Sequence, residues 1–217
     1  MSTKKIAVIL AGCGVYDGSE IHEATLTMLA IVRQGAWYQC FAPDIEQAHV
    51  VNHLTGQEMN EGRNVLIEAA RIARGNIKPL HEFSPGDFDA VVFPGGFGAA
   101  KNLCTFAFDG VNCTVNPDAE RVIRSMVEAG KPICALCISP VMITRVLGDV
   151  EVTIGDDKGT IEAIEALGGK HRITTHGQVV VDQKYKVVTT PCYMLDATIS
   201  QIADGAENAI RTILEMI

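Results

Sequence analysis

The sequence predicts an α/β fold in which a mostly parallel sheet lies between two layers of helices. Short apolar segments alternate with segments of helical periodicity along the chain. Several apolar segments show no polar alternation, as expected of parallel strands that are buried on both faces. Hydrophobic residues make up 47% of the 217 residues and charged residues 20%, which is enough apolar material for a large core.

In the first half of the chain, strands and helices are expected to alternate. We predict strands at 4–10, 36–43 and 88–96, and helices at 21–35 and 64–75. Gly35 and Gly75 are placed to end the two helices, because glycine readily adopts the left-handed conformation found there. Pro43 ends the second strand. Residues 44–62 are less regular and predict a short ribbon or a loop.

The second half of the chain continues the pattern. We predict helices at 117–130, 138–147, within 156–169 and at 196–216, and strands at 131–136 and 149–154. Residues 177–191 predict two strands joined by a tight polar turn. We find no linker, internal repeat or low-complexity tract, so we predict one domain over 1–217.

Charge and composition exclude several classes of protein. A net charge of −8 argues against a nucleic-acid partner. No apolar segment approaches the length that crosses a bilayer, and the run at 6–11 is too short for a signal peptide. Seven cysteines, an odd number, argue against a secreted disulfide framework. We therefore expect a soluble cytoplasmic protein with no membrane partner.

Cys137 lies where a short apolar strand meets a helix, in the segment "KPICALCISP". A residue on such an elbow is expected to have a strained backbone and to project into the open. The amides at the helix start favour a thiolate, which predicts a lowered pKa, and they can hold an oxyanion. The alternative is that Cys137 is a core residue at the end of a strand.

Cys134 and Cys137 also form a CxxC spacing. Cys134 falls within the predicted strand, too early for a thioredoxin-like pair, so we interpret it as packing. A structural zinc site needs a second ligand pair at metal spacing, and His49 and His53 are expected in a loop. The glycines of "GCGVYDG" resemble a dinucleotide fingerprint, but the third is one residue late. We predict no metal and no cofactor.

The carboxyl ends of parallel strands meet at one edge of a sheet, which places the loops after Leu10, Phe93, Leu136 and Thr190 together. Glu23, in the first turn of a helix, can then hydrogen-bond the Cys137 thiol or move a proton. The alternative is an acid favoured by the helix dipole, with Ser19 as the N-cap. Gly95 and Gly96 form either half of an oxyanion hole or an ordinary tight turn.

Taken together, these segments resemble the ThiJ/PfpI superfamily, relatives of class I glutamine amidotransferase domains. The resemblance covers nearly the whole chain and is strongest to the ElbB branch, the isoprenoid-biosynthesis glyoxalase-like proteins. The segments that carry it are "GCGVYDGSEIHE", "NHLTG", "RNVLIEAARI", "GGFGAAKNL", "KPICALCISP" and "VTTP".

The resemblance implies a flavodoxin-like three-layer sandwich, a homodimer and a reactive cysteine at the nucleophile elbow. Carried over by position, that cysteine is Cys137, the carboxylate is Glu23, and the backbone groups are Gly95, Gly96 and Ile138. It further implies a glyoxalase-like lyase that needs no glutathione and converts small 2-oxoaldehydes, such as glyoxal to glycolate.

The sequence departs from the superfamily pattern in its histidines. No His follows the elbow cysteine, and the late His-x-Glu pair of amidotransferases is replaced by "TTPCYM". The base is therefore unassigned, and His22, beside Glu23, is a candidate. The missing His also keeps open an alternative function in which the same cysteine senses oxidants or electrophiles. Amide hydrolysis would require the His and is not favoured.

Overall fold

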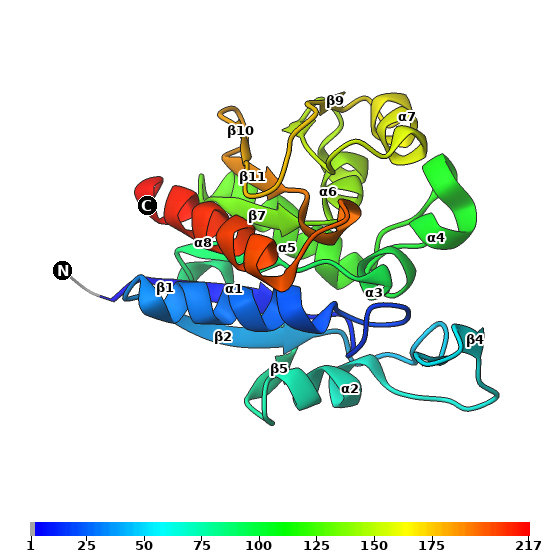
Figure 1. Ribbon diagram of the computed structural model, residues 1–217. Helices are drawn as coiled ribbons and strands as arrows, with labels where there is room; N and C mark the ends of the chain where they lie inside the picture. The colour runs from blue at the N-terminus through cyan, green and yellow to red at the C-terminus, as the bar shows by residue number, and fades with distance from the viewer. Residues whose placement is uncertain (1–2) are drawn as a thin grey trace.

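A computed structural model describes residues 3–217 and places a seven-stranded sheet at the centre of the molecule (Figure 1). The strand order is β10-β11-β7-β6-β1-β2-β5. All neighbouring pairs are parallel except β10 and β11, which form the predicted antiparallel pair. The strands are β1 (Lys5–Ile9), β2 (Trp37–Ala42), β5 (Ile77–Pro79), β6 (Ala90–Phe93), β7 (Ile133–Leu136), β10 (Val180–Asp182) and β11 (Val187–Thr190).

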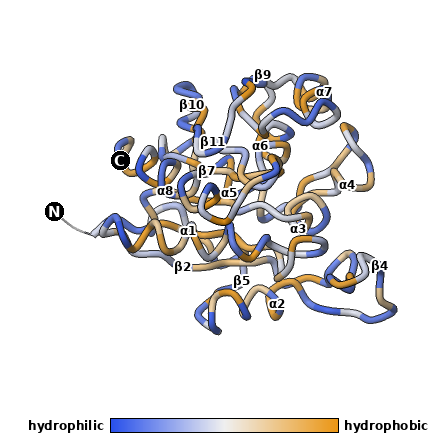
Figure 2. The backbone as a smooth tube through the Cα atoms, viewed as in Figure 1, coloured by the Kyte–Doolittle hydropathy of each residue, from blue (hydrophilic) through white to orange (hydrophobic). Residues whose placement is uncertain are grey.

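Helices cover both faces of the sheet, because the central strands are apolar on both sides. The helices are α1 (Ile21–Arg33), α2 (Val65–Ile72), α3 (Phe97–Lys101), α4 (Phe106–Asp109), α5 (Pro117–Glu128), α6 (Pro140–Leu147), α7 (Lys158–Ala166) and α8 (Ile199–Glu215). In β1, Ile6 and Val8 pack with α1, α2 and α8, whereas Ala7 and Ile9 pack with α5 and α6. The hydropathy along the chain agrees with this arrangement, because the strands are mostly apolar and the helices carry both apolar and polar residues (Figure 2). The predicted flavodoxin-like sandwich is confirmed.

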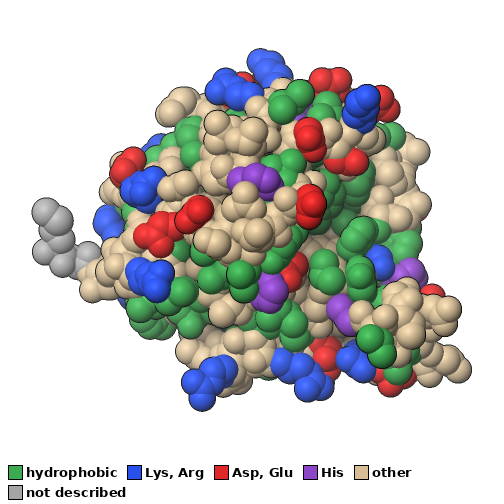
Figure 3. All heavy atoms as spheres, in the orientation of Figure 1, with side chains coloured by type: hydrophobic (Ala, Val, Ile, Leu, Met, Phe, Trp, Pro, Cys, Tyr) green, Lys and Arg blue, Asp and Glu red, His purple; other side chains and the backbone are tan. Residues whose placement is uncertain are grey.

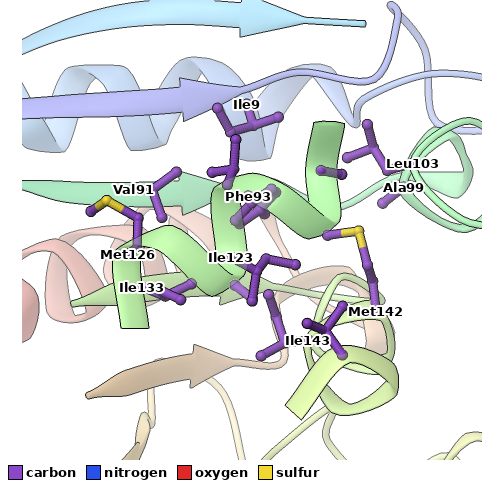
Figure 4. Packing of buried hydrophobic residues seen from close by; sticks show 14 of the residues in the cluster. Ile9, Val91, Phe93, Ala99, Leu103, Ile123, Met126, Ile133, Met142 and Ile143 are labelled. Atoms are coloured by element: carbon purple, nitrogen blue, oxygen red, sulfur yellow. The ribbon is translucent and has the colours of Figure 1, made fainter. Parts of the chain in front are cut away.

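The helices and strands thus enclose two hydrophobic cores, one on each face of the sheet. The core on the side of α5 and α6 contains residues from several elements. Val91 and Phe93 of β6 and Ile133 of β7 point toward Ile123 and Met126 of α5 (Figure 4). All five side chains have less than 1% of their surface exposed. Burial of this kind contributes roughly 1.5–3 kcal/mol to the free energy of unfolding for each large apolar side chain. The packing therefore holds the ends of these strands in fixed positions.

The structure differs from the sequence prediction mainly in small elements. The segment predicted as a strand at 149–154 contributes only β8 (Glu151–Val152), which pairs with β9 (Lys170–His171) outside the main sheet. The edge strand β5 was not predicted, because it has three residues, one of them exposed, and ends in proline. The irregular segment at 44–62 carries the short ribbon of β3 (Val51–Asn52) and β4 (Gln57–Glu58). Among residues 3–217, no helix has the length and apolar character needed to span a membrane.

Candidate functional site

Cys137 lies on a strained elbow between β7 and α6, as predicted. Its φ is 60°, in the left-handed region that residues with a side chain rarely adopt. Two hydrogen bonds hold the turn. The Cys137 amide donates to the Thr190 carbonyl at 3.0 Å, and the Ser139 hydroxyl donates to the Pro94 carbonyl at 2.8 Å. The elbow is therefore fixed to the ends of β6 and β11, the neighbouring strands.

The thiol of Cys137 is not in the open, and its predicted low pKa is wrong. Only 7% of the residue is exposed. Burial and the negative charge of Glu23 raise the pKa of the Cys137 thiol well above its ordinary value. The amides of Gly96 and Ile138 do face the sulfur and lower the pKa, but they do not offset burial. The resting group is a thiol, and it needs a base before it can attack a carbonyl.

Glu23 is completely buried beside this thiol. Its Oε2 accepts a hydrogen bond from the Gly95 amide at 2.9 Å, and its Oε1 accepts one from the Tyr193 amide at 3.2 Å. The Cys137 thiol is its neighbour, since a Cβ on Gly95 would lie within 3 Å of both Glu23 Oε2 and the Cys137 sulfur, and the interaction with the thiol lowers the pKa of Glu23. Burial, followed by the charge of Glu20, raises the pKa of Glu23 to about 8, against the lowering effect of the two amides. A carboxyl with this pKa can exchange a proton near neutral pH.

The start of α1 sets the position of Glu23. The N-cap is Glu20 and not the predicted Ser19. The Glu20 carboxylate accepts from the Glu23 amide at 2.7 Å, whereas the Ser19 hydroxyl turns inward and accepts from the Ala11 amide at 2.8 Å. Glu20 is itself tied to the next loop, because its amide donates to the Gly95 carbonyl at 2.9 Å. The helix start and the Gly95 turn therefore hold each other in place.

Gly95 and Gly96 let the backbone approach the thiol closely. A Cβ on Gly95 would lie 2.5 Å from Glu23 Oε2 and 2.9 Å from the Cys137 sulfur, closer than real side chains pack. Gly96 has a φ of 96°, which favours glycine. The three predicted backbone amides therefore have different partners. The Gly95 amide binds Glu23, while the amides of Gly96 and Ile138 face the sulfur.

His22 lies beside this pair on the exposed side of α1. Its Nδ1 shares a hydrogen bond of 2.8 Å with the Tyr193 hydroxyl. The groups that most shift the pKa of the Cys137 thiol are Glu23 and the amides of Gly96 and Ile138, and His22 is not among them. Sequence reasoning missed Tyr193, which contacts Glu23 through its amide and His22 through its hydroxyl. No local signal marks it, because it is 170 residues from Glu23.

The other two cysteines near the elbow have different surroundings. Cys134 is fully buried within β7, between Val92 of β6 and Val188 of β11, as the packing interpretation predicts. Cys192 follows β11, has a φ of 43° and is also buried. Sequence reasoning gave Cys192 no role. Among residues 3–217, no group of three or more His, Cys, Asp or Glu side chains has the geometry to hold a metal ion.

A cavity of about 350 Å³ opens above Cys137. Glu20, Gly96, Ile138 and Tyr193 contribute to its floor and sides, together with residues of α3, α4 and the start of α7. In the space-filling view, hydrophobic side chains gather around a hollow on the face that carries these elements (Figure 3). The arrangement brings together a buried thiol, a buried carboxyl, two backbone amides and a cavity.

Comparison with known proteins finds relatives over almost the full length of the chain. No family model matches the chain. The chain is 50% identical over 222 residues to the human glutamine amidotransferase-like class 1 domain-containing protein 3, mitochondrial, covering 98% of this chain and 83% of that protein. It is 47% identical over 222 residues to the rat ES1 protein homolog, mitochondrial, covering 98% of this chain and 84% of that protein.

Solved structures give the same result. A crystal structure of an isoprenoid biosynthesis protein with an amidotransferase-like domain from Ehrlichia chaffeensis superposes with a TM-score of 0.93 at 36% identity, covering 99% of each chain. Glyoxalase III from Candida albicans superposes with a TM-score of 0.63 at 14% identity, covering 99% of this chain and 97% of that chain. At this identity it shows the fold alone, which is shared with ThiJ/PfpI and DJ-1 proteins.

These relatives correct one prediction and establish the family. The human, rat and zebrafish relatives are all named mitochondrial proteins, so the predicted cytoplasmic location is wrong. That prediction relied on the absence of a membrane segment and of a disulfide framework, and neither property distinguishes the cytoplasm from other reducing compartments. With identities of up to 50% over almost its full length, the chain belongs to the glutamine amidotransferase-like class 1 domain proteins that include the ES1 homologues, on the ThiJ/PfpI fold.

Proposed function

We propose that the protein converts 2-oxoaldehydes, glyoxal in the simplest case, into 2-hydroxy acids without glutathione, as a glyoxalase-like lyase. The observation that carries the proposal is the adjacent placement of the Cys137 thiol and the buried Glu23 carboxyl, side by side at Gly95 and beneath a cavity. The name of the Ehrlichia protein supports a further link to isoprenoid biosynthesis, which we include in the proposal.

The first step forms a bond between the Cys137 sulfur and the aldehyde carbon. Ionised Glu23 takes the thiol proton as the sulfur attacks, which matches the raised pKa values of both groups. The carbonyl electron pair moves to oxygen, where the amides of Gly96 and Ile138 donate to the oxyanion. Glu23 then returns the proton to this oxygen and gives a hemithioacetal.

The second step moves hydrogen between the two substrate carbons. Glu23 removes the proton from the sulfur-bearing carbon and passes it to the adjacent carbonyl oxygen, which gives an enediol. Glu23 then takes the proton of the hydroxyl on the sulfur-bearing carbon and delivers it to the second carbon, which leaves a thioester in which the former aldehyde carbon is oxidised and its neighbour reduced. Water then cleaves the thioester, releases the 2-hydroxy acid and restores the thiol, so the net change is addition of one water.

The surroundings of the thiol favour this proposal over the two alternatives. A sensor that is easily oxidised needs thiolate character, and burial opposes it here. Amide hydrolysis needs a His base on the thiol, and within residues 3–217 no His is among the groups that most shift the pKa of Cys137. Because Glu23 has a pKa of about 8, it is suited to moving protons and less suited to stabilising a permanent thiolate.

The test is conversion of glyoxal to glycolate, followed by proton NMR, for the wild type and Cys137→Ala. We expect turnover in the wild type and none above the buffer rate in the variant. Cys192→Ala, which removes a buried thiol at the end of the adjacent strand, is the matched control and retains most of the activity. Turnover that survives in Cys137→Ala, or that is no faster than with free thiol, contradicts the proposal, and the second result favours electrophile sensing.

A further inference from the structure

The cavity above Cys137 is much larger than glyoxal requires. Its volume of about 350 Å³ lies within the range of about 300–1,000 Å³ typical of pockets that enclose drug-sized ligands. Glyoxal has two carbons and no substituent, so it would leave most of this space unfilled. A substrate with a larger group on its keto carbon would fill the space while its aldehyde reached the sulfur.

The walls of the cavity are largely apolar. Phe97 of α3 and Phe106 of α4 present aromatic side chains to it, and Phe97 keeps 48% of its surface exposed. Other apolar lining residues are Val15, Ala100, Ile138 and Met194. Walls of this kind bind an apolar substituent, because burial of apolar surface removes it from water.

The charge of the lining has one sign. Its carboxylates are Glu20 and Asp157, and within the part of the chain that the structure describes, no Lys, Arg or His lines the cavity. Asp157 accepts hydrogen bonds from the Thr160 hydroxyl and amide, which lower the pKa of Asp157 and keep it ionised. The nearby Lys101 is not among the lining residues, and its Nζ donates to the Tyr16 carbonyl and lies over the Phe97 ring.

We propose that this cavity selects uncharged 2-oxoaldehydes that carry an apolar substituent, such as an aryl group, over both glyoxal and anionic analogues. Phe97 and Asp157 are its specificity-determining residues, the first by contact with the substituent and the second by repulsion of negative charge. The inference rests on the proposed function and deepens it. The chemical steps are those above, so phenylglyoxal and water give mandelate with no oxidant or reductant.

The first experiment compares kcat/KM for glyoxal and phenylglyoxal, each divided by its rate with free thiol to remove intrinsic reactivity. We expect at least about a tenfold preference for phenylglyoxal. Phe97→Ala should reduce this preference about tenfold, because it lowers kcat/KM for phenylglyoxal much more than for glyoxal. The matched control is Phe108→Ala, because Phe108 is 49% exposed on neighbouring α4 and does not line the cavity. Equal losses for both substrates in Phe97→Ala would indicate a structural role and overturn the inference.

The second experiment tests charge with 4-carboxyphenylglyoxal, which matches phenylglyoxal in shape and adds an anion. We expect the wild type to have a lower kcat/KM for this anion than for phenylglyoxal. Asp157→Asn should raise kcat/KM for the anion at least about threefold at low ionic strength. Asparagine can still cap α7, so the substitution removes charge with little change in structure. Asp204→Asn makes the same change in net charge outside the cavity and is the control. Equal turnover of anion and neutral substrate contradicts the inference.

A third measurement separates failure of this inference from failure of the proposed function. Phenacyl bromide and 4-carboxyphenacyl bromide alkylate thiols without any turnover, and the modified Cys137 is quantified by mass spectrometry. If no 2-oxoaldehyde turns over but the neutral reagent modifies Cys137 faster, relative to free thiol, the cavity selectivity is supported and the proposed function is wrong. If the two reagents modify Cys137 equally, the selectivity is wrong whether or not turnover is found.

Discussion

Cys137 and Cys192 stand at the ends of neighbouring parallel strands and are alike in three properties. Both have a positive φ, both are nearly fully buried, and burial raises the pKa of both thiols well above the ordinary value. They differ in what surrounds the sulfur. The charge of Glu23 acts on both thiols, but Cys137 also has the amides of Gly96 and Ile138 beside it and lines the cavity, whereas Cys192 packs against α8 and is not among the lining residues. Strain and burial are therefore common to both cysteines, and the proposal that Cys137 is the nucleophile rests on the amides beside its sulfur and on its access to the cavity.

The largest effect is expected from a substitution that disturbs the surroundings of Cys137 and leaves those of Cys192 intact. Gly95→Ala would place a Cβ against both Glu23 and the Cys137 sulfur, so we expect at least a hundredfold loss of kcat/KM and about 1–3 kcal/mol of stability. Gly205→Ala is the counterpart at Cys192, where the new Cβ would lie 3.6 Å from the sulfur, an ordinary contact, and 3.2 Å from the Thr190 hydroxyl oxygen, a tight contact that a shift of a few tenths of an ångström relieves. We expect its activity to change far less in the same steady-state assay. Similar losses in the two variants would show that the elbow is not distinctive.

Glu23→Gln removes the proton acceptor and keeps the size of the side chain. We expect kcat/KM to fall about a hundredfold, because general base catalysis contributes about 10²–10⁴-fold. Thermal unfolding should be measured beside the steady-state kinetics. The Gln side chain has one acceptor oxygen, so it replaces the carboxylate for only one of the two backbone N–H groups of Gly95 and Tyr193, and the variant can lose stability. A folded variant with full activity would remove Glu23 from the mechanism.

The same variant should change how stability depends on pH. The pKa of Glu23 is raised from 4.5 to about 8, so the folded state binds the proton more tightly than the unfolded state. This contribution to stability is fully present below about pH 4.5 and is lost as pH rises through about 8, a change on the order of a few kcal/mol. Urea unfolding at several pH values should show this decline in the wild type and a flatter profile in Glu23→Gln. If the difference in unfolding free energy between wild type and Glu23→Gln is the same from about pH 4.5 to about pH 8, the raised pKa of Glu23 is wrong.

The smallest effect is expected at His22. It is exposed and hydrogen-bonds the Tyr193 hydroxyl, one step removed from the thiol, so His22→Ala should lower kcat/KM by less than about tenfold. Tyr193→Phe removes the other half of the same hydrogen bond and should give a similar loss. If His22→Ala were as damaging as Glu23→Gln, the exposed histidine would be the base in place of the buried carboxyl.

The sequence predicted the fold well, and it predicted the site only where the relevant signals are local. The strand–helix alternation, the elbow at Cys137 and the Gly95–Gly96 turn all follow from residues close together in the chain. The raised pKa of the thiol was missed because burial depends on how helices pack over the strand ends. Tyr193 was missed for the same reason, since only the folded chain brings it to Glu23. The homodimer and the single domain over 1–217 remain predictions.

The most direct test of the Cys137–Glu23 pair is the pH dependence of kcat/KM for a 2-oxoaldehyde, measured for the wild type and Glu23→Gln. Because ionised Glu23 must accept the thiol proton, we predict that kcat/KM rises with pH through an inflection near pH 8 in the wild type. In Glu23→Gln this inflection should disappear, leaving only the slow rise that accompanies ionisation of the thiol itself. An inflection well below pH 7 in the wild type, or the same profile in both proteins, would contradict the account.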